Sequence, residues 1–174
     1  MRFRFIAIIV FCLAAVGYLA YDAARDRPQP RCDSLDATSA PGAIKACTAL
    51  LQTLSASDGY RTEVLINRGI DYDMLGQYDL AMADFNAAIK LKPKLGAAYR
   101  NRAVEWHRKG DYAAAVADYD EALRLDPSDV YALYGRGVTR IKAGDTANGK
   151  ADIAAANAQG PEAANVYTLM KMQP

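Results

Sequence analysis

The side chains best suited to chemistry in this chain are its three cysteines and its single histidine. Cys32 and Cys47 lie fifteen residues apart and follow an apolar N-terminal run. If this part is exported, an oxidising compartment favours a disulfide between them. The alternative is that Cys47 is a small packing residue. The third cysteine, Cys12, lies inside the apolar run, and without a Cys-x-x-Cys motif we do not expect thiol redox catalysis.

His107 gives little support for catalysis. It stands beside Trp106, and no metal-binding cysteines or obvious nucleophile accompany it in the sequence. The glycines lie at turns or small packing positions and form no phosphate-binding loop. We therefore expect no enzyme activity, no catalytic residue, no cofactor and no metal site.

Three arginines each precede an aspartate by sixteen residues. Opposite charges that recur at one spacing predict a ladder of structural ion pairs between paired helices. A binding role for the arginines is the alternative, but repetition in every unit favours the structural role. The predicted pairs are Arg68 with Asp84, Arg102 with Asp118, and Arg136 with Asp152.

The composition excludes several classes of protein. The chain has 174 residues, 52% hydrophobic and 24% charged, which is not the composition of a disordered protein. The net charge of +1 gives no reason to expect a nucleic-acid partner. Its 34 alanines favour helices that approach one another closely, so an all-β fold is excluded.

The N-terminus predicts a membrane segment. Residues 5–21 carry no charge, and Arg2 and Arg4 precede them, which favours a cytoplasmic N-terminus and an exported remainder. We interpret residues 1–24 as an uncleaved signal anchor and residues 25–40 as a linker. The rest of the chain would then lie on the exported side of a single-pass membrane anchor. The alternative is a cleaved signal peptide and a secreted or periplasmic protein.

The rest of the chain repeats with a period of 34 residues. This spacing separates Pro93, Pro127 and Pro161, and the arginine and aspartate series share it. Gly76, Gly110 and Gly144 are also 34 residues apart, and they suit turns that need a positive φ. The repeats run 62–95, 96–129 and 130–163, each a helix, a turn and a second helix.

This pattern resembles the tetratricopeptide repeat (TPR) family over about three-quarters of the chain. The family's small, aromatic, Ala, aromatic, Ala and Pro positions hold Gly69, Tyr72, Ala81, Phe85, Ala88 and Pro93 in repeat one, and Ala103, Trp106, Ala115, Tyr119, Ala122 and Pro127 in repeat two. Repeat three departs, with Arg140 and Ile153 at the aromatic positions and Gly149 at the first alanine. The resemblance implies an all-α, right-handed superhelical solenoid. The half repeat with its cysteines looks like bacterial envelope members of the family, which implies a periplasmic domain on a single-pass inner-membrane anchor.

Partial repeats are expected at both ends of the array. Residues 41–61 match a second helix without its first, which makes a half repeat. Residues 164–172 are predicted to be a capping helix after repeat three. The repeat domain would then span residues 41–172.

The family resemblance implies a concave groove lined by the first helix of each pair. The matching positions hold Ile66, Ile70, Asp73, Arg100, Val104, His107, Tyr131, Tyr134, Val138 and Ile141. The Lys and Asn clamp that some relatives use for chaperone tails is missing. We expect a non-catalytic module that binds a peptide or partner protein in this groove. The alternatives are a self-associating structural envelope component, and a groove covered by residues 162–172.

Overall fold

We describe a computed structural model of the chain at residues 40–52, 57–160, 163, 164, 167 and 172. These residues form α-helices and turns, with no strand among them. The helices are α2 (Ala40–Leu51), α3 (Asp58–Met74), α4 (Tyr78–Leu91), α5 (Gly96–Arg108), α6 (Tyr112–Leu125), α7 (Val130–Lys142) and α8 (Thr146–Gln159). The prediction of an all-α helical repeat is confirmed.

The turn inside each repeat has the same hydrogen bonds. After α3, the Gly76 amide donates to the Asp73 carbonyl and the Gln77 amide donates to the Tyr72 carbonyl. This is a Schellman motif, which needs a residue of positive φ after the helix. Gly76, Gly110 and Gly144 have φ values of 72°, 79° and 94°, as the 34-residue spacing predicts.

The helix starts are set by short polar side chains. The carboxylates of Asp111 and Asp145 accept a hydrogen bond from the backbone amide three residues on, as expected for N-caps of α6 and α8. Asp129 caps α7 in the same way. The first helix of repeat one begins earlier than the repeat register predicts, at Asp58 rather than 62, because Ser57 accepts from the amide of Tyr60.

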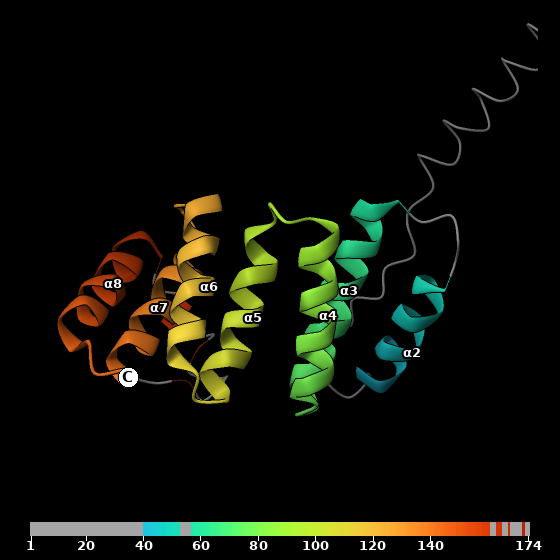
Figure 1. Cartoon of the computed structure of the whole chain (residues 1–174), viewed down its shortest axis with the longest axis horizontal. Helices are drawn as coiled ribbons and strands as arrows, with labels where there is room; N and C mark the ends of the chain where they lie inside the picture. Colours follow the sequence, from blue (N-terminus) through green and yellow to red (C-terminus); the bar gives the residue numbers. More distant parts are fainter. Residues whose placement is uncertain (1–39, 53–56, 161–162, 165–166, 168–171, 173–174) are drawn as a thin grey trace, which may run out of the picture. The chain divides into compact units, whose positions relative to one another are not determined.

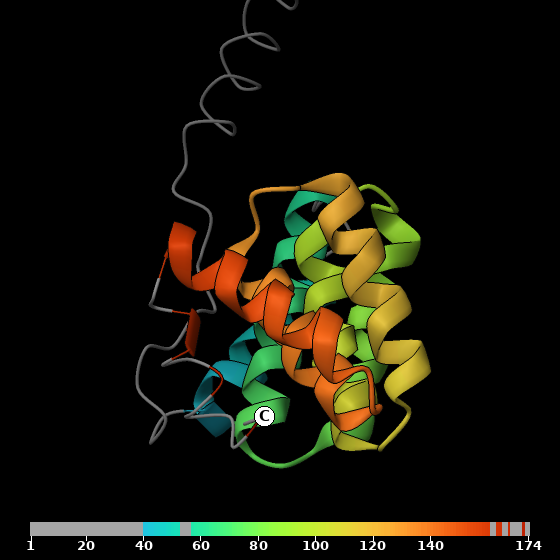
Figure 2. The ribbon, with the colours of Figure 1, turned by 90° about the vertical axis from the view of Figure 1, so that its left-hand side faces the viewer.

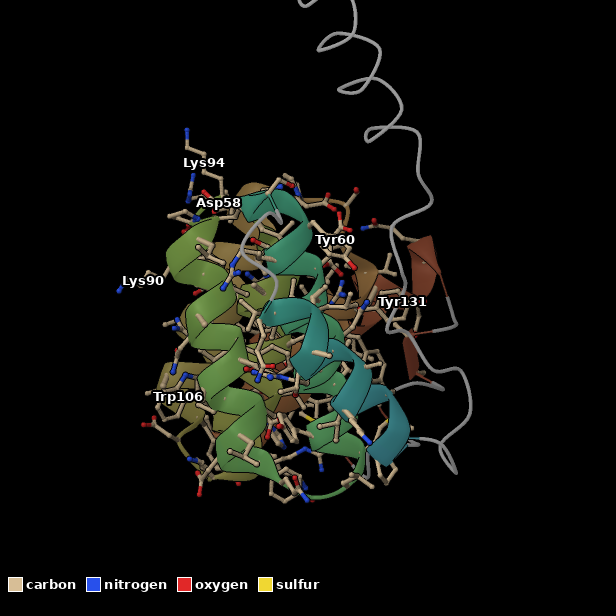
Figure 3. All side chains as sticks on the ribbon, turned by 90° about the vertical axis from the view of Figure 1, so that its right-hand side faces the viewer. Asp58, Tyr60, Lys90, Lys94, Trp106 and Tyr131 are labelled. Atoms are coloured by element: carbon tan, nitrogen blue, oxygen red, sulfur yellow. The ribbon has the colours of Figure 1, made fainter. Side chains whose placement is uncertain are left out.

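The helices stack in two layers, which Figure 1 shows with α4 in front of α3 and α6 in front of α7. We call the side formed by α3, α5 and α7 the inner face. Between the layers lie the residues that carry the repeat pattern, and Ala81, Phe85, Ala115 and Tyr119 are all buried. Small and large side chains alternate along the second helix of each repeat, which lets the two helices of the repeat pack closely. Figure 3 places Tyr131 of α7 on the side opposite Lys90 of α4.

At the N-terminal end of the described domain, α2 packs against α3. Cys47 is fully buried against Val64, and it is disulfide-bonded. Its predicted partner, Cys32, lies outside the described residues, and so do the predicted anchor at 1–24 and most of the linker at 25–40. Among the residues described, no helix has the length and apolar character needed to cross a membrane.

At the C-terminal end, Ala163, Ala164 and Tyr167 are helical, and the last two lie in the range 164–172 predicted as a capping helix. Tyr167 and Met172 are buried in one cluster with residues of α5, α7 and α8. In Figure 2 this red segment lies on the side away from α6. The segment therefore covers part of the inner face.

Candidate interaction surface

The three predicted ion pairs are present, and each has the same two-point geometry. In each pair the arginine Nε and one terminal nitrogen donate to the two carboxylate oxygens of the aspartate, at 2.7–2.8 Å. The arginines also reach a neighbouring helix: Arg102 donates to Asn86 and Arg136 to Asp120. All three arginines are thus committed to joining helices, which is the structural role.

The predicted groove residues lie on α3, α5 and α7, but the inner face is not an open groove along its length. Val104 is only 4% exposed and Val138 is fully buried. Both pack in the cluster that contains Tyr134, Tyr167 and Met172. At α5 and α7 the chain's own C-terminal segment covers these positions, so the alternative of a covered groove holds there.

Arg100, predicted to be a groove residue, already has partners. Its guanidinium donates to Asp129 at 2.6 Å and lies 5.5 Å from the centre of the Tyr131 ring. Its charge is therefore matched within the chain by Asp129.

The polar groove residues on α3 and α5 form a buried cluster. Asp73 pairs with Arg108 at 3.2 Å, and its carboxyl interacts electrostatically with the buried carboxyl of Glu105. Burial, with the nearby Asp73 charge, raises the pKa of Glu105 to about 8. Burial also raises the pKa of Asp73. Sequence reasoning singled out Asp73 but missed Glu105. Nothing in the repeat pattern indicates that the carboxyl groups of these two residues come close together.

His107, the predicted groove histidine on α5, is also buried. Its Nδ1 is 2.9 Å from the hydroxyl of Thr139. Burial, together with the charges of Lys142 and Arg108, lowers the pKa of His107 to about 4, so the ring is neutral near pH 7. Within the described ranges no group of His, Cys, Asp and Glu is arranged to hold a metal ion.

The remaining predicted groove residues differ in exposure. Ile66 and Ile141 are half-buried, whereas Ile70 is exposed. Ile70 belongs to a surface that sequence reasoning did not find. We call it the apolar patch, and it consists of Ile70, Met74, Leu75, Tyr78 and Leu80. These are all the large exposed hydrophobic side chains recorded for the described residues, at 38–50% exposed, and they gather at the α3–α4 turn.

A depression of about 320 Å³ adjoins the apolar patch. It is lined by residues 76–80 together with Arg108 and Lys109. The Arg108 guanidinium lies 5.1 Å from the centre of the Tyr78 ring, and Lys109 pairs with Asp79 at 2.7 Å. The patch therefore has charged residues at its edge.

Two family models match the chain, one described as Tetratricopeptide repeat at residues 62–95 and one as TPR repeat at residues 106–144. The chain contains tetratricopeptide repeats. Neither model describes an enzyme. No curated protein sequence matches the chain.

Solved TPR structures share this fold. MamA from Desulfovibrio magneticus has a TM-score of 0.62 at 14% identity, over 72% of this chain and 68% of MamA. The Arabidopsis OM64 TPR domain has 0.59 at 23%, over 66% of this chain and 98% of that one. The first TPR of Spaghetti (RPAP3), bound to an HSP90 peptide, has 0.58 at 24%, over 68% and 96%.

Proposed function

We propose that this TPR protein is a non-catalytic interaction module that binds a partner protein through the apolar patch on repeat one. The observation that carries the proposal is the gathering of the exposed large hydrophobic side chains at one turn. Exposed apolar side chains that lie in a group often mark an interaction site, whereas single scattered ones need no explanation. The relative RPAP3, solved with a bound peptide, supports a binding role for this fold.

The other two repeats supply an internal comparison. The patch positions on repeat one lie in the same fold context as positions 34 and 68 residues later. Met74, Leu75, Tyr78 and Leu80 correspond to Arg108, Lys109, Tyr112 and Ala114, and then to Lys142, Ala143, Thr146 and Asn148. Since polar or small residues stand at the positions of Met74, Leu75 and Leu80 in repeats two and three, the fold does not require apolar side chains there.

The apolar patch also adjoins the part of the inner face that the C-terminal segment leaves open. Ile70 occupies the repeat position of Val104 and Val138, yet it is exposed whereas they are buried. A partner seated on the patch would therefore also reach the half-buried Ile66, one helical turn before Ile70 on α3.

The test replaces patch residues with those of repeat two. Met74→Arg with Leu75→Lys should abolish cross-linked capture of the partners that the wild-type chain captures from native membranes. The matched control places lysines at equivalent exposed positions of repeat three, Ala143→Lys with Asn148→Lys, and should leave capture intact. Loss in both variants, or in neither, would refute the patch as the binding site.

Self-association is the second outcome that this test distinguishes. If the captured partner is another copy of the chain, sedimentation of the purified protein should show an oligomer that the patch variant lacks. If the purified protein is a monomer and the wild-type chain captures a different protein, the first proposal is supported. An oligomer that the patch variant retains would contradict both.

We further propose that the repeat domain is exported and tethered to the bacterial inner membrane by residues 1–24. The support is the uncharged run at 5–21 behind Arg2 and Arg4. The protein should then sediment with membranes, and protease added to spheroplasts should digest the repeat domain. A mature N-terminus at or beyond residue 18 would show a cleaved signal instead.

A further inference from the structure

Tyr167 is seated on the inner face as a bound ligand would be. It is 2% exposed, its ring stacks on that of Tyr134 with centres 5.4 Å apart, and its hydroxyl donates to the Tyr119 hydroxyl at 3.3 Å. Met172 is buried in the same cluster, and its amide donates to the Tyr167 carbonyl at 2.9 Å. This backbone hydrogen bond joins the two residues.

The site for the Tyr167 ring depends on the absence of a side chain at Gly135. A Cβ there would clash with the Tyr167 hydroxyl and would lie 2.6 Å from the Tyr119 hydroxyl, closer than real contacts allow. The equivalent positions of repeats one and two hold Asn67 and Asn101. Repeat three alone thus has room for a phenol here.

The residue that faces Gly135 has changed as well. Tyr119 occupies the repeat position that Phe85 holds one repeat earlier. At that earlier junction the residues are Phe85 and Asn101, whereas here they are Tyr119 and Gly135. The added hydroxyl and the missing side chain together create the site that accepts the Tyr167 hydroxyl.

The sequence of the C-terminal segment, residues 161–174, has no arginine to form the ion pair that is present in each full repeat. In repeats one to three an arginine at the seventh position pairs with an aspartate on the second helix. The seventh position of the next register is residue 170, a methionine. The Tyr167–Tyr119 hydrogen bond is also long for two hydroxyl groups, which usually approach to 2.7–2.8 Å. Among the described residues of this segment, Ala163, Tyr167 and Met172 are buried in the cluster with α5, α7 and α8.

We propose that Tyr119, Tyr134 and Gly135 form a socket for a tyrosine side chain, filled in the same chain by Tyr167, and that a partner segment with a tyrosine five residues before an apolar side chain competes for it. The spacing of the competing segment is that of Tyr167 and Met172, which reach the same cluster. This socket is separate from the apolar patch, so the proposal goes beyond the proposed function.

Occupation within one chain makes the socket hard to reach from outside. A segment joined by a short connection acts at an effective concentration of about millimolar. A free segment of the same sequence therefore competes poorly until the internal one is removed. The C-terminal segment thereby limits access to the inner face at α5 and α7.

The first test removes the internal tyrosine in the full chain. A fluorescent peptide with the sequence of residues 161–174 should bind the Tyr167→Ala variant at least tenfold more tightly than the wild type, measured by anisotropy. The same peptide with alanine in place of its tyrosine should not bind. Equal affinity for both proteins, equal binding of both peptides, or no binding to the variant would overturn the proposal.

A second variant keeps the test decisive if Tyr167→Ala weakens the fold. Tyr119→Phe with Gly135→Asn places the residues of the preceding junction at this one and fills the socket. Hydrogen exchange in residues 163–172 should accelerate at least tenfold while exchange in α3 and α4 stays unchanged, and the peptide should not bind. Unchanged exchange in 163–172, or equal acceleration in all helices, would overturn the proposal.

Discussion

Gly149 of α8 and Gly137 of α7 bring the two helix backbones into contact. A Cβ on Gly149 would lie 2.6 Å from the Gly137 carbonyl oxygen, and a Cβ on Gly137 would lie 2.8 Å from that of Gly149. Repeats one and two have Ala81 and Ala115 at the position of Gly149. This departure from the repeat pattern is therefore a packing adjustment, in which the alanine of the pattern would not fit.

Restoring the pattern should consequently weaken the protein. Gly149→Ala should lower the free energy of unfolding by about 1–3 kcal/mol, because the new methyl group meets backbone atoms. The matched control is Gly42→Ala in α2, where a Cβ would meet no atom within 4 Å. That control should gain about 0.5–1 kcal/mol from helix propensity. Urea unfolding measures both, and a stabilising Gly149→Ala would contradict the contact.

The Arg102–Asp118 pair predicts an asymmetry between single and double replacement. Both side chains are largely buried, so Arg102→Leu alone leaves an unpaired carboxylate and should cost about 3 kcal/mol. Adding Asp118→Leu should recover more than half of this loss, because no buried charge then remains. Urea unfolding of the two single variants and the double variant checks this. Additive losses would show that the pair contributes nothing specific.

Glu105 predicts that stability falls as pH rises from 6.5 to 8. Its pKa in the folded state is about 8, raised first by burial and then by the Asp73 charge, whereas the unfolded chain releases this proton near pH 4.5. The folded state thus holds the extra proton, and ionisation in the unfolded state favours unfolding. The loss over this range is at most about 2 kcal/mol for one proton. Thermal melts at pH 6.5 and 8.5 measure it.

Between pH 4.5 and 6.5, His107 acts in the opposite direction. The pKa of His107 is about 4 in the folded state, whereas an unperturbed histidine in the unfolded chain has a pKa of 6.5. The unfolded chain therefore binds the proton first, and stability rises with pH. The two effects oppose one another there, and the fall due to Glu105 emerges above pH 6.5. Glu105→Gln should remove that fall, and an identical pH profile for wild type and variant would exclude Glu105 as its cause.

The predicted disulfide between Cys32 and Cys47 has a measurable stability effect. A loop of this length contributes about 3 kcal/mol in the chain-entropy model. Cys32→Ser should lower stability by that amount, and reductant should destabilise the wild type but not the variant. Cys12→Ser is the control and should change neither result. Mass spectrometry without reductant should identify linked Cys32 and Cys47 peptides, and free thiols at both positions would refute the pairing.

The repeat fold could be predicted from the sequence because its determinants recur at a fixed spacing. Gly76, Gly110 and Gly144 have to adopt a positive φ at each turn, and buried Ala81 and Ala115 have to be small. Three instances of each signal identify the architecture. The early start of α3 could not be read from the period, because it depends on the local cap at Ser57.

The candidate surface was less predictable, since it depends on what covers each position. Val104 and Ile70 share a repeat position, but only Val104 lies under the C-terminal segment. The sequence did contain a signal for the apolar patch: Met74 and Leu75 replace the Arg108 and Lys109 of the next repeat. The apolar patch is found by comparing exposed positions between repeats, rather than the buried positions that define the repeat.

The arginine ladder also has a consequence for how such a protein lengthens. Arg136 donates to Asp152 of its own repeat and to Asp120 of the repeat before. An ion pair between neighbouring repeats thus takes its arginine from one repeat and its aspartate from the other. A tandem duplication of the coding segment for residues 96–129 would bring a new arginine next to an existing Asp120. The arginine of the added unit would then find its partner from the preceding repeat already in place.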